Sequence, residues 1–241
     1  MLKTSRMIKT VGTFAVAAAL ATSALFATGC SGDTGSSSST ATASSSAASS
    51  SAAQTTAADQ DLMSGTHHAV IEVEGYDPIT VELDADAAPI TVTNFVDLAN
   101  DGYYDGLTFY RIVEDFCLQG GSAGNSAATI NDGITPIIGE FSENGVDNPL
   151  ADQFGRGTIA MARTNDPDSA TSTFFVTLGD NSAVGASLDG KYAAFGTIDD
   201  AGMVTIDKIV ADYVPSVDDP SMGTISDEAS QAKIKSITIT D

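Results

Sequence analysis

One arginine stands inside an otherwise apolar, strand-like run of this sequence. Arg111 lies in the run 109–113, and an arginine is rarely buried without a charged partner or a chemical task. A second β-rich piece follows at 116–119, and the two-residue period of a strand puts Cys117 and Gln119 on the same face of it. A guanidinium and a carboxamide would then meet over one surface groove.

A simpler interpretation of Arg111 is a structural ion pair. Glu114 and Asp115 follow it closely in the sequence, and either carboxylate would neutralise a guanidinium near the end of an ordinary strand. The run taken alone leaves both interpretations open. The rest of the sequence favours the groove.

Short strands and two helices are the elements that the sequence predicts for positioning these side chains. Apolar residues on one face after Pro89 indicate a helix at 88–99, and a second helix is predicted at 203–211. Alternating apolar and polar residues predict strands at 69–74, 79–83, 109–113, 116–119, 157–162, 172–178, 193–198 and 232–240. About eight short antiparallel strands favour a mainly β fold, a closed barrel capped by the two α-helices, because closure removes exposed strand edges.

The N-terminal segment 1–29 has the pattern of a secretory signal. Three basic residues precede an apolar, alanine-rich run at 11–26, which has the charge pattern and length of a signal and not of a spanning helix. The run leads to Cys30 and resembles the lipobox of bacterial lipoproteins, with Ala27 where leucine is commonest. This resemblance implies lipidation of Cys30 and an extracytoplasmic protein anchored to the cell membrane. The alternative is an ordinary cleaved signal and a soluble secreted protein.

A tether and one domain follow the signal. Segment 30–61 consists almost entirely of serine, alanine and threonine, which is too poor in large apolar residues to fold, so we expect a disordered tether. A flexible chain of this length reaches on the order of 30 Å. The remaining residues, 62–241, are enough for a single domain with its own core.

Composition excludes several classes of ligand. The chain has 32 acidic and 10 basic residues, for a formal net charge of −22, which argues against nucleic acid or anionic lipid as a partner. No spaced third ligand accompanies His67 and His68, so we expect a solvated loop pair, no metal and no cofactor. The only cysteines are Cys30 and Cys117, so lipidation of Cys30 would leave no partner for a disulfide. We expect a monomer, bound to the membrane only through its lipid.

Six motifs, in the right order and at suitable spacing, give the domain a resemblance to a known family. They occupy 88–95, 109–121, 139–145, 157–163, 172–175 and 188–196. Over residues 69–240 the domain resembles the cyclophilin-type peptidyl-prolyl cis-trans isomerases. The resemblance implies an enzyme that isomerises proline-containing polypeptides and assists the folding of exported proteins.

The resemblance also implies roles for individual residues. Arg111 would be the catalytic arginine, with Gln119 and Phe116 beside it in the active groove. Ala162 and Arg163 would present backbone to the substrate. The implied substrate-binding set, with a proline pocket among its members, is Tyr110, Cys117, Ala162, Arg163, Thr173, Phe175, Leu188, Tyr192 and Phe195.

Some positions depart from the commonest pattern of that family. Thr173 stands where glutamine is usual and Ser187 where many members have tryptophan. The chain contains no tryptophan, so a tryptophan contact to the inhibitor cyclosporin cannot form, and low sensitivity is expected. These departures keep open a second function class, a proline-peptide binding module or chaperone with little turnover.

The chemistry of such a groove follows from the peptide bond itself. Rotation of the planar amide costs about 18–20 kcal/mol, and X-Pro bonds populate cis enough for the exchange to matter. In the twisted transition state the prolyl nitrogen gains a lone pair, so a donor such as Arg111 binds that state preferentially. An apolar pocket withdraws water from the amide, and Cys117 in it is expected to be a wall residue and not a nucleophile.

Overall fold

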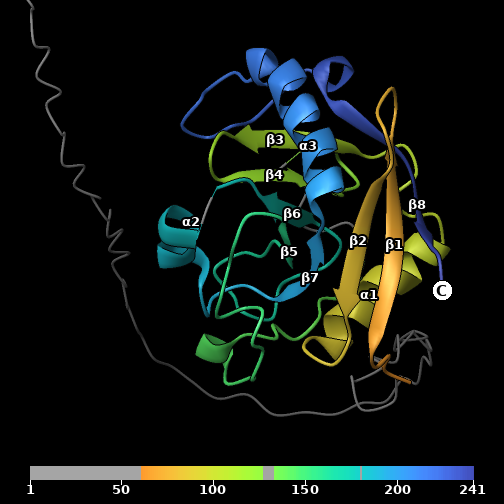
Figure 1. Cartoon of the computed structure of the whole chain (residues 1–241), viewed down its shortest axis with the longest axis vertical. Helices are drawn as coiled ribbons and strands as arrows, with labels where there is room; N and C mark the ends of the chain where they lie inside the picture. Colours follow the sequence, from red (N-terminus) through yellow and green to blue (C-terminus); the bar gives the residue numbers. More distant parts are fainter. Residues whose placement is uncertain (1–60, 127–132, 180) are drawn as a thin grey trace, which may run out of the picture. The chain divides into compact units, whose positions relative to one another are not determined.

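The computed structural model of the chain describes residues 61–126, 133–179 and 181–241. Within these residues the strands form one closed antiparallel barrel in the order β1-β2-β7-β5-β6-β4-β3-β8. The strands are β1 (Thr66–Val73), β2 (Ile79–Asp84), β3 (Thr108–Val113), β4 (Cys117–Gly120), β5 (Thr158–Met161), β6 (Phe174–Thr177), β7 (Ala194–Ile198) and β8 (Ala232–Ile239). The predicted eight-stranded closed barrel is confirmed (Figure 1).

The hairpin β1–β2 shows how the sequence pattern produces the barrel wall. On β2 the buried residues Ile79, Val81 and Leu83 alternate with the exposed Thr80 and Glu82. Successive side chains of a strand point to opposite faces, so one face fills the barrel and the other meets water. The alternation that predicts these strands therefore also fixes which side chains enter the core.

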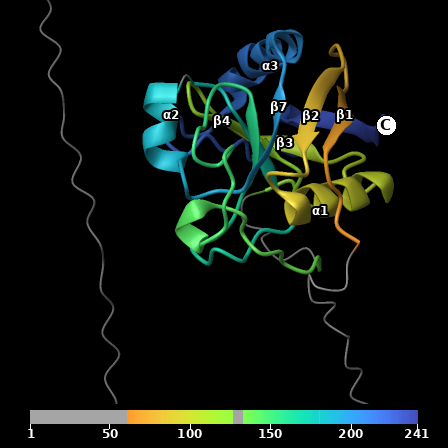
Figure 2. The same ribbon diagram turned by 60° about the horizontal axis from the view of Figure 1, so that its bottom comes forward.

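The two predicted helices are α1 (Pro89–Asn100) and α3 (Asp200–Tyr213), and they lie at opposite ends of the barrel (Figure 2). The helix α3 begins earlier than predicted because Asp199 caps it, accepting a 2.8 Å hydrogen bond from the Gly202 N–H. A third helix, α2 (Asn181–Leu188), is not predicted by the sequence pattern, because its residues are mostly small and show no continuous apolar face. Short 3₁₀ turns occur at η2 (Ser142–Asn144), η3 (Val214–Ser216) and η4 (Glu228–Ser230).

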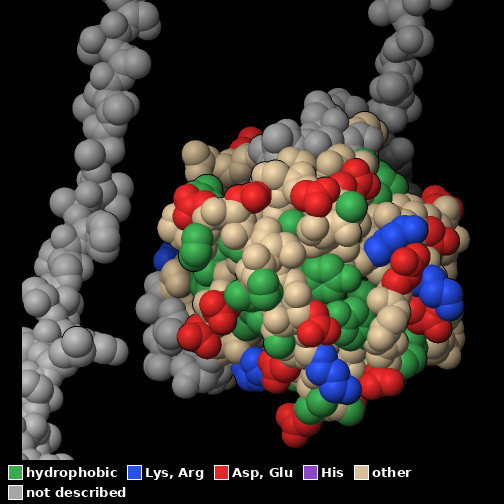
Figure 3. Space-filling model, turned by 90° about the horizontal axis from the view of Figure 1, so that it is seen from above, with side chains coloured by type: hydrophobic (Ala, Val, Ile, Leu, Met, Phe, Trp, Pro, Cys, Tyr) green, Lys and Arg blue, Asp and Glu red, His purple; other side chains and the backbone are tan. Residues whose placement is uncertain are grey.

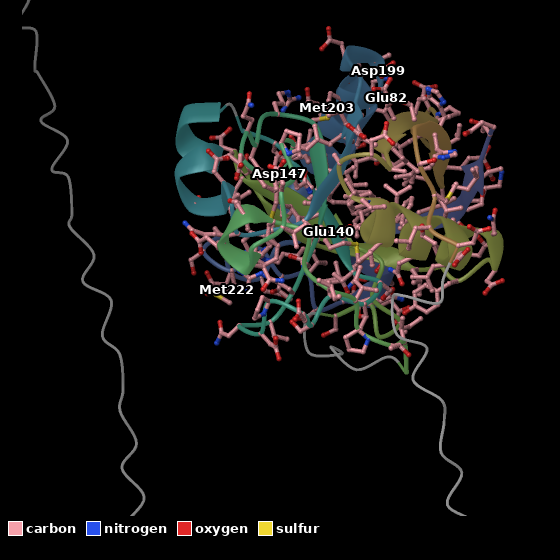
Figure 4. All side chains as sticks on the ribbon, turned by 90° about the horizontal axis from the view of Figure 1, so that it is seen from below. Glu82, Glu140, Asp147, Asp199, Met203 and Met222 are labelled. Carbon is pink, nitrogen blue, oxygen red and sulfur yellow. The ribbon has the colours of Figure 1, made fainter. Side chains whose placement is uncertain are left out.

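The start of α1 is capped by a buried carboxylate from a distant loop. Ala88 precedes the helix and offers no side-chain cap. Instead Glu140, which is 2% exposed, accepts hydrogen bonds from the N–H groups of Ile90 at 3.1 Å and Thr91 at 2.8 Å, and from the Thr91 hydroxyl at 2.6 Å. Figure 4 shows Glu140 alongside α1. A negative charge at a helix N-terminus satisfies orphan donors and complements the helix dipole.

Removal of this cap is expected to destabilise the domain. In Glu140→Ala the buried donors of Thr91 lose their acceptor, which costs about 2–3 kcal/mol of unfolding free energy. Urea unfolding measures the loss. The matched control is Glu143→Ala, because Glu143 lies exposed on the same loop and a surface change of this kind is expected to stay within about 0.5 kcal/mol. Equal stability of the two variants would contradict the capping role.

The two histidines are not in a loop, so that expectation is wrong. His67 and His68 lie within β1. The ring Nδ1 of His67 lies 2.6 Å from a carboxylate oxygen of Asp241, and the His68 N–H donates to the other oxygen at 2.6 Å. Their role in the described part of the chain is to hold the C-terminal residue against β1. Among those residues no group of three histidine, cysteine or acidic side chains is arranged to hold a metal ion.

The N-terminal predictions fall outside the described residues. These are the signal at 1–29, the anchor at Cys30 and the tether at 30–61, apart from Asp61. In the part of the chain that the structure does describe, no helix has the length and apolar character needed to cross a membrane.

Candidate active site

Arg111 is held in place by three neutral acceptors. It lies opposite Gln119 in the β3–β4 pairing, and its Nη1 donates to Gln119 Oε1 at 2.9 Å and to Cys117 Sγ at 3.3 Å. Its Nε donates to the Met222 carbonyl at 2.7 Å. The predicted meeting of guanidinium and carboxamide is therefore present in the structure.

Within the described residues, Arg111 has no carboxylate within 4.0 Å. The simpler interpretation, an ion pair with Glu114 or Asp115, is thus wrong. Those two residues form the β3–β4 turn, in which Asp115 adopts a φ of +58°. The guanidinium keeps its charge uncompensated at the edge of the groove, where a ligand can use it.

A bulge in β3 explains how two consecutive residues reach one groove. The β3–β4 register shifts between Phe109 and Arg111, and such a shift reorients side chains that would otherwise point to opposite faces. Tyr110 and Arg111 consequently line the same cavity. Gln119 connects them, because its Nε2 donates to the Tyr110 hydroxyl at 2.8 Å, and burial raises the pKa of that hydroxyl.

A segment before β8 also supports the arginine, and sequence reasoning left its role open. The carbonyl of Gly223 accepts from the Ile112 N–H at 2.7 Å, and the Ile225 N–H donates to the Tyr110 carbonyl at 2.9 Å. These bonds fix the Met222 carbonyl that receives Arg111 Nε. Gly223 has a φ of +75°, and a Cβ there would lie 2.3 Å from the Ile112 oxygen, so only glycine fits. Asp219-Pro220 and Gly223 are signals of a tight turn, but nothing in the sequence says which strand the turn touches.

An apolar pocket of about 170 Å³ lies beside Arg111 and Gln119. Its apolar walls are Phe116, Cys117, Phe175, Leu188 and Tyr192. Phe175 is fixed by two rings, stacked on Phe154 at 6.3 Å and edge-on to Tyr192 at 5.6 Å between ring centroids. The dimensions and lining suit a small saturated ring.

Cys117 forms part of that pocket wall as a thiol. It is 1% exposed, and burial raises its pKa to about 11, although the nearby Arg111 acts in the opposite direction. A thiol with this pKa is essentially protonated near neutral pH and is a poor nucleophile. The position of Cys117 therefore agrees with the expectation of a wall residue.

A second cavity of about 270 Å³ adjoins the apolar pocket. The two share Arg111, Gln119, Ala162 and Arg163, and the second adds Tyr110, Thr173 and Met222. Met222 is 60% exposed and lies at the edge of the domain (Figure 4). The groove thus has two compartments that meet at Arg111 and Arg163. One is the apolar pocket, named for its aromatic and aliphatic walls, and the other, lined by hydroxyl-bearing residues, is called the polar compartment below.

Phe195 is not part of the groove, so its assignment to the proline pocket is wrong. It is fully buried and packs inside the barrel, where its ring centroid lies 5.1 Å from that of Phe95. Along β7, Ala194 faces the cluster of buried residues outside the barrel wall and Phe195 faces the barrel interior. The sequence indicates that both positions are buried, but it does not indicate which one faces the barrel interior and which one faces the outside of the wall.

The other predicted residues lie together at the groove: Arg111, Gln119, Phe116, Tyr110, Cys117, Ala162, Arg163, Thr173, Phe175, Leu188 and Tyr192. Ser187 is exposed, and its hydroxyl donates to the Val184 carbonyl at 3.1 Å. Sequence reasoning missed Met222, whose carbonyl binds Arg111, and Phe154, which stacks behind Phe175.

Comparison with known proteins agrees with this geometry. The family described as cyclophilin type peptidyl-prolyl cis-trans isomerase/CLD matches residues 68–239. Peptidyl-prolyl cis-trans isomerase A of Dickeya dadantii is 40% identical over 132 residues, which cover 54% of this chain and 65% of that relative. Peptidyl-prolyl cis-trans isomerase B of Escherichia coli is 36% identical over 148 residues, which cover 60% of this chain and 80% of the relative.

The Dickeya relative is matched over less than two thirds of its own length. Among solved structures, a cyclophilin type peptidyl-prolyl cis-trans isomerase of Cryptosporidium parvum superposes with a TM-score of 0.57. It covers 73% of this chain and 99% of its own at 22% identity. The same Cryptosporidium protein has also been solved in the presence of the dipeptide Ala-Pro. At this identity the likeness establishes the barrel fold.

Proposed function

Because the chain belongs to the family of cyclophilin-type peptidyl-prolyl cis-trans isomerases, we propose that it isomerises X-Pro bonds in exported polypeptides. One observation carries the proposal: the Arg111 guanidinium, with no carboxylate partner among the described residues, lies at the mouth of an apolar pocket. Proline-limited folding takes tens of seconds or more without a catalyst. Acceleration of this step would assist proteins folding outside the cytoplasmic membrane.

Arg111 is the proposed source of transition-state selectivity. When the amide twists, the prolyl nitrogen becomes pyramidal and acquires a lone pair that the planar ground state lacks. Nη1 and Nε are oriented by Gln119, Cys117 and the Met222 carbonyl, which leaves the remaining donors of the guanidinium for the substrate. A donor that gains its acceptor only in the twisted state raises the rate.

The apolar pocket supplies binding and desolvation. Phe116, Phe175 and Leu188 would hold the pyrrolidine ring while the bond before it rotates. Withdrawal of water favours the twisted amide, which is less polar than the planar one. No covalent bond is broken and no proton is transferred, so the protonated thiol of Cys117 is compatible with this chemistry.

The direct test is catalysis of cis-to-trans exchange in a short prolyl peptide. We expect the chain to accelerate the exchange well above the uncatalysed rate. The second candidate, a binding module or chaperone, is favoured by the exposed Ser187 and by Thr173 at the polar compartment. Peptide binding without acceleration would support that candidate and overturn the proposed activity.

We further propose that the protein is a monomer anchored outside the cytoplasmic membrane through lipid on Cys30. The support is the signal-like segment 1–29 and the serine-rich stretch 30–61 that separates the cysteine from the barrel. A single acyl chain binds membranes only weakly, whereas two chains anchor a protein stably. A diacylglycerol group would therefore keep the isomerase at the membrane surface.

The variant Cys30→Ser is expected to move the protein from the membrane fraction to the medium or the soluble fraction. Loss of the thiol removes the attachment point of the lipid. The matched control is Cys117→Ser, which changes the only other cysteine and is expected to leave the protein with the membrane. An unchanged distribution of the Cys30 variant would exclude the lipid anchor.

A further inference from the structure

Basic side chains are few in this acidic protein, and most of those that the structure describes are paired. The chain has 10 lysines and arginines, of which seven lie in the part that the structure describes. Four of the seven form ion pairs of 2.6–3.3 Å. The pairs are Arg156 with Asp207, Lys208 with Asp77, Lys233 with Glu74 and Lys235 with Glu72.

The remaining three, Arg111, Arg163 and Lys191, have no carboxylate within 4.0 Å among the described residues. Two of the three line the groove, and the backbone of the third contacts one of them. Arg111 and Arg163 line both compartments, and the Lys191 carbonyl accepts a 2.8 Å hydrogen bond from Arg163 Nε. Acidic side chains are scattered over the surface shown in Figure 3. Of the three basic side chains without a carboxylate partner among the described residues, two line the groove.

Arg163 is held in place by its contacts, but these contacts do not use all of its N–H donors. Its guanidinium carbon lies 5.1 Å from the ring centroid of Phe141 and 4.8 Å from that of Tyr192. Besides the bond to the Lys191 carbonyl, Nη1 donates to the Thr164 carbonyl at 2.8 Å. A guanidinium has five N–H donors, so donors remain for a ligand, and the planar group is preorganised for a carboxylate.

The described residues that line the polar compartment next to Arg163 carry no negative charge. Apart from Arg111, Gln119 and Arg163, the polar side chains among them are hydroxyl-bearing, and none has a carboxylate. The hydroxyl-bearing residues are Tyr110, Ser126, Thr164, Ser169, Thr171 and Thr173. The Thr164 hydroxyl donates to Ser169 Oγ at 2.8 Å, and the Ser169 hydroxyl donates to the Asp166 carbonyl at 2.6 Å. An acidic side chain in this compartment would therefore depend on the Arg163 guanidinium for its hydrogen bonds.

We propose that Arg163 gives the groove a preference for substrates with an acidic residue one or two positions before the proline. This inference rests on the proposed isomerase function. We place the proline ring in the apolar pocket with its nitrogen toward Arg111. The residues before the proline would then extend toward the polar compartment, which shares Arg111 and Arg163 with that pocket. Arg111 is committed to the rotating amide. Arg163 is the cation left to select the neighbouring side chain.

Long-range repulsion acts against this preference, since the protein carries a formal net charge of −22. At 0.15 M salt the screening length is about 8 Å. The repulsion from distant surface charges is therefore weakened, while the attraction within an ion pair in direct contact persists. A comparison of the wild-type chain with Arg163→Gln separates the long-range repulsion from the local attraction to Arg163. The two proteins have nearly the same overall electrostatic field, and they differ only in the guanidinium at position 163.

The experiment measures kcat/KM of the full chain for matched peptides Xaa-Ala-Pro-Phe and Ala-Xaa-Pro-Phe, with glutamate, glutamine or lysine at Xaa. Each rate is compared with the uncatalysed exchange of the same peptide. We expect the wild-type chain to prefer glutamate over glutamine by about three- to tenfold in at least one series. In Arg163→Gln the ratio should fall to about one or below, and Arg163→Lys should retain part of it.

The outcomes separate the two levels of inference. Equal kcat/KM for the glutamate and glutamine peptides with the wild-type chain, alongside clear catalysis, overturns the acidic preference and leaves the isomerase intact. Catalysis of none of the peptides overturns the isomerase instead. The wild-type comparison needs no variant, so it stands even where Arg163→Gln disturbs the Lys191 and Thr164 contacts. A ratio that survives in Arg163→Gln assigns the preference to another group and overturns the role of Arg163.

Discussion

Replacement of Arg111 by alanine is expected to lower kcat/KM for prolyl isomerisation by about one to two powers of ten. A charge-assisted hydrogen bond contributes about 1.5–3 kcal/mol, and each factor of ten in rate corresponds to about 1.4 kcal/mol. Because the bond to the prolyl nitrogen forms only in the twisted state, the loss should appear in kcat more than in KM. Exchange kinetics of a chromogenic or NMR-observed prolyl peptide give both constants.

Two control variants define the origin of the loss. Arg111→Lys keeps the charge but not the planar group that bonds Gln119, Cys117 and the Met222 carbonyl, so an intermediate rate is expected. Arg156→Ala removes an arginine whose partners are Asp207 and the Leu178 carbonyl. None of these three residues lines the groove, so this variant should leave the rate unchanged. A rate for Arg111→Ala within threefold of wild type would overturn the mechanism.

Substitution of Phe195 by alanine is expected to destabilise the domain by about 3–5 kcal/mol. The side chain is fully buried in the barrel and contacts Phe95, which itself packs against Tyr104 and Phe174. Removal of the ring leaves a cavity that this aromatic cluster cannot fill without moving. Chemical unfolding measures the change, and Phe195→Leu, with an expected cost of about 1–2 kcal/mol, serves where the alanine variant does not fold.

The contrasting variant is Phe116→Ala, at the half-buried wall of the apolar pocket. It is expected to lower kcat/KM by about tenfold, since the lost contact with the prolyl ring is worth about 1–2 kcal/mol, and to change stability little. Phe195→Leu should show the reverse pattern, a loss of stability with nearly normal kinetics. Impaired kinetics with full stability in Phe195→Leu would return that residue to the pocket.

The barrel was predictable because its determinants are local. The alternation at Ile79, Val81 and Leu83 and the apolar face of α1 each specify one element from neighbouring residues. The predicted boundaries are wrong where the end of a strand or helix is set by contacts with residues distant in the sequence. The first strand includes His67 and His68 because they pair with Leu83 and Glu82 of β2, and Asp241 also contacts both residues.

The site was predictable in membership and less so in arrangement. Family resemblance pointed to the groove residues, and all of them except Phe195 lie at the two compartments. Phe174 and Phe175 show why that one assignment failed. They are adjacent on β6, yet Phe174 belongs to the barrel interior and Phe175 to the cluster outside its wall. In this fold an apolar side chain can be buried either inside the barrel or against the outside of its wall. A pattern of apolar residues does not distinguish the two locations.

The sequence by itself determined the approximate positions of the eight strands and of the helices α1 and α3. It also determined that one guanidinium stands in an apolar run and that the chain is strongly acidic. Only the tertiary structure decided that Arg111 is held by Met222 from a segment 111 residues away, and that Arg163 lines both compartments of the groove. The physical reason is the range of the interactions involved. Backbone periodicity is set by neighbours along the chain, whereas the freedom of a charge to meet a ligand depends on every group that the fold brings near it.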